Sequence, residues 1–287
     1  MEDFLNSLLI IIVTYKEPYF NCKSFCSLLE SLDQKYFPNL NFFIYDNSPT
    51  SYINSKNDIN SVYQNINLTY NHDSSNAGLG VAYNKGAAIA KQTNKKWLLI
   101  LDQDTDFPKN VLVAYFKAVT SNSDVDIFAP TLFTEDMKLI SPSKYLFRRG
   151  FPLPFIPNGI TSLKNITPIN SGTLISLTLF NSVGGYNEKI RLDFSDHAFM
   201  DKVRQKRKFL FIINCKIVHN LSSYSVNTLD KEITRFRFFC EGAKAAGEET
   251  HSKFNYFIIS SLRAIKLSYL FKDSTFLSIL YKNWLFK

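Results

Sequence analysis

The amino-acid sequence predicts an α/β fold built on a doubly wound, mostly parallel central sheet. Segments with strand-like and helix-like patterns alternate over the first 130 residues, which is the order found in such sheets. Residues 8–15 form a continuous apolar run rich in β-branched side chains, typical of a strand buried on both faces. Thr14, Asp46 and Asp102 close three of the strand-like runs, and open α/β sheets bind ligands at that edge.

Each further element of this first half follows from its local pattern. Short apolar runs predict strands over residues 41–45, 68–70, 97–101 and 126–129. Apolar residues at helical spacing predict helices over residues 18–32, 80–91 and 110–121. The second strand ends in Asp-Asn-Ser-Pro at residues 46–49, which are turn-forming residues.

The second half begins differently. Five prolines interrupt residues 141–171, and we expect a long functional loop there. The pattern then predicts a strand over 172–177, a helix over 196–205, a strand over 209–213 and helices from 232 to the end. We therefore expect a main α/β domain over residues 1–222, whose halves meet near residue 130, and a C-terminal helical extension over residues 223–287.

Composition and charge limit the classes of protein. A chain of 287 residues with 45% hydrophobic and 20% charged residues is globular rather than disordered. The four cysteines lack zinc-finger spacing, so we expect free buried thiols rather than a disulfide framework or a structural zinc. The net charge of +8 favours an anionic partner: nucleic acid, a membrane surface or a phosphorylated substrate.

The termini and hydropathy bear on location. The N-terminus lacks the positively charged region that opens a signal peptide. No stretch reaches the ~18 uncharged apolar residues that a transmembrane helix needs. We expect a cytoplasmic protein, with the inner face of the cell membrane as a further location if the chain binds lipid.

The strongest local signal for chemistry is Asp102-Gln103-Asp104 at the end of the strand over 97–101. Two carboxylates two residues apart can reach one ligand, and hard oxygen donors suit Mg²⁺ or Mn²⁺ beside a diphosphate. An Asp-x-Asp pair also occurs in ordinary turns after strands. The position at a central strand end favours the metal site.

Several segments in order resemble the family 2 glycosyltransferases of the GT-A fold. The first four are residues 10–15, 44–48, 76–86 and 101–104, and a later block joins Ser171–Ile175, Val183–Glu188 and Leu192–Asp196. The resemblance covers roughly residues 8–222. The Asp-Gln-Asp version, followed by Thr105 and Pro108, is most similar to the bacterial rhamnosyltransferase-type branch.

On the donor side the resemblance implies a nucleotide-sugar site. Thr14, Tyr15 and Asp46 would hold the base, with Asp46 accepting a hydrogen bond from a ring N–H. Asn76 and Gly78 would pack against the nucleotide. Asp102 would lie near the ribose. The alternative for Asp46 is a turn cap before Pro49.

The resemblance also implies the metal and acceptor residues. Asp104 would bind Mg²⁺ or Mn²⁺, and His219 falls where many members place a histidine near the metal or diphosphate. Asp196 falls at the catalytic base, with Asp193 and Gly172 on the acceptor side or behind it. The alternatives are a helix cap for either aspartate and a structural role for His219.

Three features depart from the family pattern. Ser195 stands where an acidic residue commonly precedes the base, and Ala198 replaces an acidic or aromatic residue. Residues 235–239, Arg-Phe-Arg-Phe-Phe, are similar to an arginine–aromatic segment of the family, but Glu241 and Gly242 follow it. The identity of the acceptor is therefore not carried over.

The tail beyond Arg263 alternates lysines with aliphatic and aromatic residues at helical spacing. That composition suits an interfacial helix on anionic lipid. It suits equally a pair of helices packed on the domain or in a subunit contact. A lipid-linked acceptor would make docking on a membrane useful.

The resemblance implies an inverting, metal-dependent transfer of a hexose or deoxyhexose, with rhamnose as one case, from a nucleotide diphosphate sugar to a saccharide acceptor. The setting would be bacterial surface polysaccharide synthesis. One alternative is a sugar-1-phosphate nucleotidyltransferase, which would need a Gly-rich phosphate loop after the first strand, where Thr14-Tyr15-Lys16-Glu17 stands. The other is a basic nucleic-acid-binding protein, but no such module's signature is present, and we expect no nucleic-acid partner.

Overall fold

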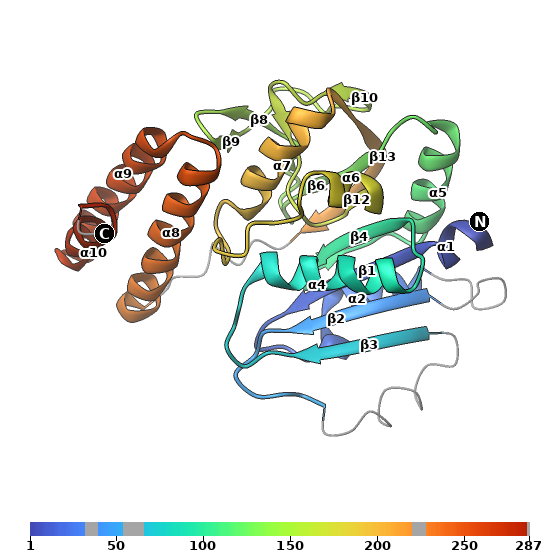
Figure 1. Cartoon of the computed structure of the whole chain (residues 1–287), viewed down its shortest axis with the longest axis horizontal. Helices are drawn as coiled ribbons and strands as arrows, with labels where there is room; N and C mark the ends of the chain where they lie inside the picture. The colour runs from blue at the N-terminus through green and yellow to red at the C-terminus, as the bar shows by residue number, and fades with distance from the viewer. Residues whose placement is uncertain (32–39, 54–65, 220–227, 286–287) are drawn as a thin grey trace.

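A computed structural model describes residues 1–31, 40–53, 66–219 and 228–285. Within these residues a ten-stranded sheet forms the centre of the molecule, and a separate sheet has three strands (Figure 1). The α/β class and the mostly parallel central sheet predicted from the sequence are confirmed.

The parallel half of the sheet carries the strand ends that the sequence singled out. Its order is β3-β2-β1-β4, with β1 over Leu8–Thr14, β2 over Leu40–Asp46, β3 over Ile66–His72 and β4 over Trp97–Asp102. The register pairs Thr14 with Asp46 and Val13 with Asp102. The three polar strand ends therefore share one edge, toward which the arrows of β2 and β3 point in Figure 1.

The other half of the sheet mixes directions. Antiparallel β12 (Thr173–Ser176) joins β4 to β6 (Ile127–Phe133), and β13 (Phe209–His219) runs parallel to β6. Three short strands complete the sheet: β5 (Thr105–Asp106) and β10 (Gly159–Ser162) beside β13, and β7 (Leu139–Ser141) beside β6. The smaller sheet has the order β11-β8-β9, over Ile166–Thr167, Ser143–Leu146 and Arg149–Phe151.

Helices cover both faces of the sheet because β1 is apolar on both sides. Leu8, Ile10 and Ile12 face one cluster, and Leu9, Ile11 and Val13 face the other. The first cluster contains residues of α1 (Glu2–Asn6), α2 (Lys23–Glu30), α5 (Val111–Ser121) and the 3₁₀ turn η1 (Tyr19–Asn21). The second contains residues of α4 (Leu79–Gln92), α6 (Leu177–Ser182) and α7 (Ser195–Lys206).

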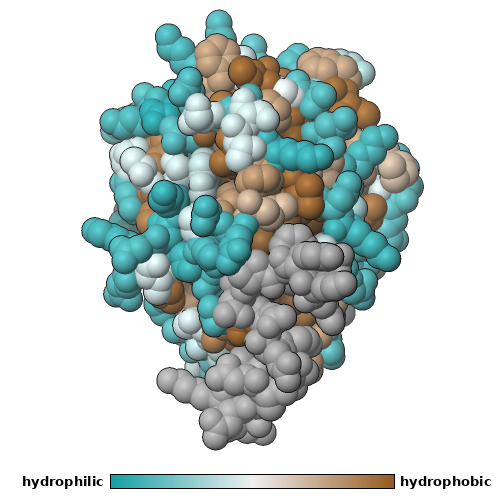
Figure 2. Space-filling view, turned by 90° about the vertical axis from the view of Figure 1, so that its right-hand side faces the viewer, coloured by the Kyte–Doolittle hydropathy of each residue, from teal (hydrophilic) through white to brown (hydrophobic). Residues whose placement is uncertain are grey.

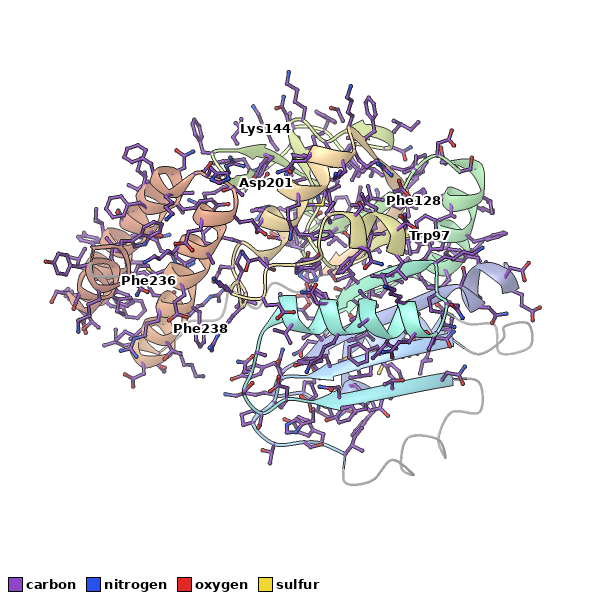
Figure 3. All side chains as sticks on the ribbon, in the orientation of Figure 1. Trp97, Phe128, Lys144, Asp201, Phe236 and Phe238 are labelled. Atoms are coloured by element: carbon purple, nitrogen blue, oxygen red, sulfur yellow. The ribbon has the colours of Figure 1, made fainter. Side chains whose placement is uncertain are left out.

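The C-terminal helices have a core of their own. They are α8 (Leu229–Glu249), α9 (Lys253–Phe271) and α10 (Thr275–Leu285), and they stand beside the strand ends in Figure 1. Phe236, labelled in Figure 3, lies in this core, which also takes in Ile190, Phe194 and Ala198. The boundary expected at residue 222 lies outside the described residues.

The expectation of a long loop over residues 141–171 is wrong in one respect, because this segment contains the four short strands β8, β9, β10 and β11. All five of its prolines lie outside these strands, where no ladder hydrogen bond is needed. Strands of two to four residues leave too short an alternation to recognise. The last strand, β13, is also longer than the 209–213 expected.

The surface and the cysteines are unexceptional for a globular chain. Hydrophobic side chains appear between hydrophilic ones on the face at the right of Figure 1, which faces the viewer in Figure 2. All four cysteines are free, and Cys22, Cys215 and Cys240 are buried. Within the described ranges, the helices are all too short or too polar to cross a bilayer.

Candidate active site

The turn between β4 and β5 carries Asp102, Gln103 and Asp104. Ser24 of α2 holds this turn: its Oγ donates to the carbonyl of Asp102 and accepts from Thr105 N–H at 3.2 Å. Gln103 turns its side chain away from the aspartates. Its Oε1 accepts from Tyr15 N–H at 2.7 Å, which ties the ends of β1 and β4 together.

Asp102, Asp104 and His219 form a cluster that could hold a metal ion. The antiparallel pairing of β13 with β5 sets His219 opposite Thr105, next to the aspartates. One ligand atom from each of the three residues lies within 4.8 Å of the others. His219 Nδ1 is 3.4 Å from Asp104 Oδ1, and that oxygen is buried without a hydrogen-bond partner among the described residues. Two carboxylates and an imidazole suit Mn²⁺ or Mg²⁺, so the donor set fits the predicted cation.

The electrostatics of the cluster also indicate a site for a cation. Burial raises the pKa of Asp102 to about 6, against the lowering effect of His219. Burial raises the pKa of Asp104 as well, again opposed by His219. Buried carboxylates of this kind are unfavourable alone, and a bound cation would compensate their charge.

Two residues without an assigned role orient His219. Thr105 Oγ1 lies 2.8 Å from His219 Nδ1 and 2.6 Å from Ser171 Oγ, and all three side chains are buried. A histidine that binds a metal through one ring nitrogen usually hydrogen-bonds through the other. The signal was in the sequence, since Thr105 directly follows Asp104 and Ser171 precedes Gly172.

The residues expected to hold the base lie on the neighbouring strand ends. Thr14 is buried, and its Oγ1 has no hydrogen-bond partner among the described residues, whereas Tyr15 is exposed. Asp46 is buried and already engaged: Oδ1 accepts from Ser48 N–H at 2.8 Å and Oδ2 from Tyr70 O–H at 2.5 Å. The turn-capping alternative for Asp46 is therefore present in the structure.

Asn76 and Gly78 adopt positive φ, 50° and 96°, before α4. A Cβ at Gly78 would lie 2.6 Å from the backbone of Arg191, and Leu79 N–H donates to Arg191 C=O at 2.9 Å. The close approach that Gly78 permits is thus to the segment that leads to Asp193 and Asp196. Gly172, with φ 79°, packs against Pro130, and its carbonyl accepts from Tyr115 O–H.

Asp196 lies in the first turn of α7, where its Oδ1 accepts from His197 N–H at 2.7 Å. His197 Nδ1 is 3.8 Å from that oxygen, a neighbour for which the sequence predicted no role. Asp193 faces two arginines of the C-terminal helices: its Oδ1 lies 3.7 Å from Arg263 and 3.9 Å from Arg235. Burial raises the pKa of Asp193, and Arg263 and Arg235 lower it.

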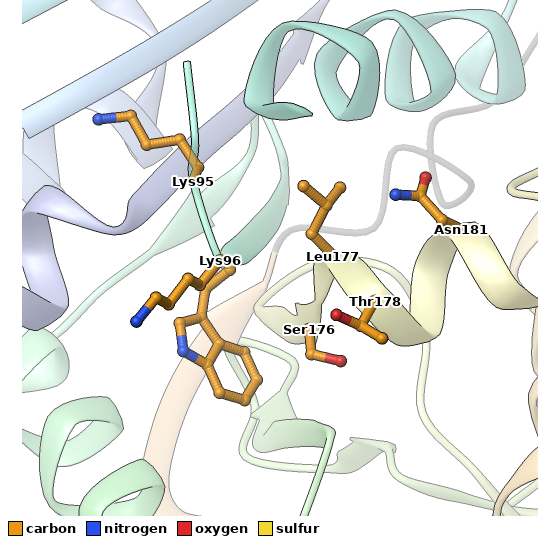
Figure 4. A pocket seen from close by; sticks show the side chains of 7 residues that line it. Lys95, Lys96, Ser176, Leu177, Thr178 and Asn181 are labelled. Atoms are coloured by element: carbon orange, nitrogen blue, oxygen red, sulfur yellow. The ribbon is translucent and has the colours of Figure 1, made fainter. Parts of the chain in front are cut away.

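One cleft of about 1060 Å³ joins these parts. Its lining includes Asp102 and His219 of the metal cluster and also Asp193, Asp196 and His197. The other expected site residues are not among its lining residues: Thr14, Tyr15, Asp46, Asn76, Gly78, Asp104 and Gly172. A smaller cavity of about 310 Å³, lined by Lys95 to Trp97 and by Ser176 to Thr178 with Asn181, lies at the opposite edge of the sheet (Figure 4).

A series of polar and aromatic contacts links Asp102 to Ser195, the residue before Asp196. Tyr83 O–H donates to Asp102 Oδ1 at 3.2 Å, and its ring lies 4.9 Å from that of Tyr186. Tyr186 O–H donates to Asn170 at 2.7 Å, and Asn170 Nδ2 donates to Ser195 Oγ at 3.3 Å. Ser195 thus makes a structural contact at the position where an acidic residue was expected.

The β8–β9 hairpin forms one wall of the cleft, to which it presents Arg149, Gly150 and Phe151. It is fixed to Asp201 of α7 (Figure 3), which accepts hydrogen bonds of 2.8 Å from both Tyr145 and Arg148. Gly150 allows the hairpin to approach Ser143 and His197. The segment expected as a functional loop is therefore a supported wall of the cleft.

Comparison with known proteins identifies the family of this chain. Residues 9–178 match the family described as Glycosyl transferase family 2. The dTDP-rhamnosyl transferase RfbF of Shigella flexneri is 24% identical over 153 residues, which are 53% of this chain and 51% of RfbF. This chain thus spans about half the length of that curated relative.

Solved structures show the same fold at low identity. The crystal structure of S. aureus TarS 1-349 is 14% identical with a TM-score of 0.52, covering 97% of this chain and 89% of TarS 1-349. The same TarS fragment in complex with UDP-GlcNAc is 13% identical with a TM-score of 0.52, covering 87% of this chain and 72% of that one. The fold is of the GT-A type, and the chain belongs to glycosyl transferase family 2.

Proposed function

We propose that this chain is an inverting glycosyltransferase that requires Mg²⁺ or Mn²⁺. The observation that supports the proposal most directly is that Asp102, His219 and Asp196 line one cleft. A transferase needs a donor diphosphate site and an acceptor base facing one reaction space. Family membership argues against both the nucleotidyltransferase and the nucleic-acid-binding alternatives.

The donor side uses the shared edge of the parallel strands. Asp104 and His219 would hold the cation, which when bound offsets charge on the leaving diphosphate. Asp102, expected near the ribose, lies close enough to both to share the cation. Thr14, Tyr15 and Asp46 would hold the nucleotide base, and Asn76 and Gly78 the loop beside it. Because Asp46 is engaged by Ser48 and Tyr70, it would act by fixing this strand end as well as by accepting from the base.

The reaction is a single displacement. The acceptor hydroxyl oxygen attacks the anomeric carbon, its proton passes to Asp196, and the bond from the anomeric carbon to the diphosphate oxygen breaks. Attack opposite the leaving group inverts the anomeric centre. His197 and the hairpin residue Phe151 lie on the acceptor side of the cleft, and an exposed aromatic ring suits stacking on a saccharide.

The donor is a nucleotide diphosphate hexose or deoxyhexose, and dTDP-rhamnose is the first candidate because RfbF is named for it. The acceptor is a saccharide, free or lipid-linked, in bacterial surface polysaccharide synthesis. Residues 1–130 form the donor half, 131–222 the acceptor half and 223–287 the helical extension.

We also propose that α9 rests on an anionic membrane, at the inner face of the cell membrane. Five exposed side chains form a stripe along this helix: Phe254, Ile258, Leu262, Ile265 and Tyr269. Residues 253–285 contain five lysines and arginines against one acidic residue, Asp273. An apolar stripe on a basic segment suits anionic lipid.

The test is a thermal-shift screen of dTDP-rhamnose, UDP-N-acetylglucosamine and GDP-mannose, each with and without Mn²⁺. A ligand that binds the native state raises stability by RT ln(1 + [L]/Kd). We expect one nucleotide sugar to raise the melting temperature, and to do so more strongly with Mn²⁺. A chain that responds to none of them would contradict the proposed function.

A further inference from the structure

The turn that carries Asp196 has an unusual backbone. Phe194, two residues before it, has φ 75° and ψ −5°, which is the left-handed region. An aromatic residue is unfavourable there because its Cβ crowds the backbone. Such a conformation persists only where the surrounding structure fixes it, and it is common at functional sites.

Contacts with the C-terminal helices fix the left-handed conformation of Phe194. The ring of Phe194 is buried among them, 4.7 Å from the ring of Phe239 in α8 and edge-on to Tyr256 in α9 at 5.3 Å. Gly242 of α8 lets that helix approach closely, since a Cβ there would lie 3.0 Å from the carbonyl oxygen of Asp193. The backbone immediately before α7 is therefore held on the extension.

Charged side chains of the same helices hold the preceding residue. Arg263 lies 3.7 Å from Asp193 Oδ1 through Nη1 and 3.3 Å from Glu232 Oε1 through Nη2, with its guanidinium 4.2 Å above the ring of Phe239. Arg235 approaches the same Asp193 oxygen at 3.9 Å. Arg235, Phe239 and Arg263 also line the cleft beside Asp196. The extension thus contacts the active site directly.

We propose that the C-terminal helices position the catalytic base, with Phe194 and Asp193 as the positioning residues through which they act. This inference rests on the proposed function, since it concerns the base named there. It gives the extension a role in chemistry in addition to any role at a membrane. Asp46, Asp102 and His219 lie at the ends of β2, β4 and β13, and none of them takes part in the contacts of Phe194 and Asp193 described above, so we expect donor and metal binding to be retained when these contacts are weakened.

The test compares two phenylalanines of the same core. Phe194→Leu shortens the anchor of the turn, whereas Phe276→Leu makes the same change at a fully buried residue whose ring neighbours are Phe236 and Phe271. Nucleotide release with water as acceptor is measured for whichever of dTDP-rhamnose and UDP-N-acetylglucosamine the wild type turns over. Melting temperature and donor KM are measured in parallel.

We expect Phe194→Leu to lower kcat at least tenfold with donor KM within twofold of wild type. Phe276→Leu should lower the melting temperature comparably and leave kcat within twofold. Equal kcat losses in both variants, or a wild-type kcat in Phe194→Leu, would overturn the inference. If Phe194→Leu does not fold, Arg263→Gln takes its place, and we expect the same result: a kcat at least tenfold lower with donor KM within twofold of wild type.

Asp196→Asn distinguishes failure of this inference from failure of the proposed function. If Asp196→Asn turns over at the wild-type rate, the proposed base is wrong, and the inference falls with it. If Asp196→Asn is inactive and Phe194→Leu is fully active, only the inference falls.

Discussion

Thr105→Val tests whether the Asp102–Asp104–His219 cluster binds a metal ion. The change keeps the shape of a buried side chain and removes the hydroxyl that contacts His219 Nδ1 at 2.8 Å and Ser171 Oγ at 2.6 Å. Without that contact the imidazole loses the partner that fixes its ring. Loss of such a partner typically costs about 10–100-fold in metal affinity, which is about 1.4–2.8 kcal/mol of binding free energy.

The assay is titration of Mn²⁺ by calorimetry, with the melting temperature measured separately. Removing the hydroxyl also leaves Ser171 short of a hydrogen bond, so we expect about 1–3 kcal/mol of lost unfolding free energy. Thr131→Val is the matched control: Thr131 is buried on β6 and donates one bond of 3.0 Å to the carbonyl of Cys215. It should lose stability and keep its Mn²⁺ affinity. Unchanged Mn²⁺ affinity in Thr105→Val would refute the reasoning.

Three further predictions concern pH, the acceptor and lipid. Because burial raises the pKa of Asp102 to about 6, a proton competes with the metal for this carboxylate at low pH. The affinity for Mn²⁺ should therefore fall about fourfold or more between pH 7.5 and 5.5. An affinity that rises over this range would contradict this prediction. Phe151→Ala should raise the acceptor KM about 3–10-fold. Phe147 lies at the exposed tip of the same hairpin and outside the cleft lining, so Phe147→Ala should leave the acceptor KM unchanged. Equal effects of the two changes would argue against stacking of the Phe151 ring on the acceptor. The double variant Leu262→Asp with Ile265→Asp should no longer float with phosphatidylglycerol vesicles in flotation assays, whereas the control Ile160→Asp on β10 should still bind them. If the wild type does not bind such vesicles at low salt, a lipid role is excluded.

The parallel half of the fold could be predicted from the sequence because its strands are unambiguous. Residues 8–13 are apolar on both faces, and the turns that follow β2, β3 and β4 are rich in Asp and Asn. The same reasoning placed Asp102 and Asp46 at one edge, since parallel strands end on the same side. The register of β1 with β2 and β4 shows why it succeeded.

The other features of the candidate site depend on contacts between segments that are distant in the sequence. His219 reaches Asp104 only because β13 pairs with β5, and no local pattern reports a pairing across more than 100 residues. The left-handed conformation of Phe194 is equally hidden, because an aromatic residue rarely adopts it. Tyr70 could not be anticipated as a partner of Asp46, because it lies 24 residues away on another strand, whereas the contact with Ser48 is the local turn cap that the sequence offered as the alternative.

The central claim is that one cleft holds the donor at the metal cluster and deprotonates the acceptor with Asp196. The most direct measurement is nucleotide release by wild type, Asp196→Asn and Asp193→Asn, with donor affinity measured separately by calorimetry in the presence of Mn²⁺. We predict that Asp196→Asn binds donor as wild type does and loses roughly 10²–10⁴-fold in turnover, and that Asp193→Asn loses less. Near-normal turnover by Asp196→Asn, or a collapse of turnover in Asp193→Asn alone, would contradict the account.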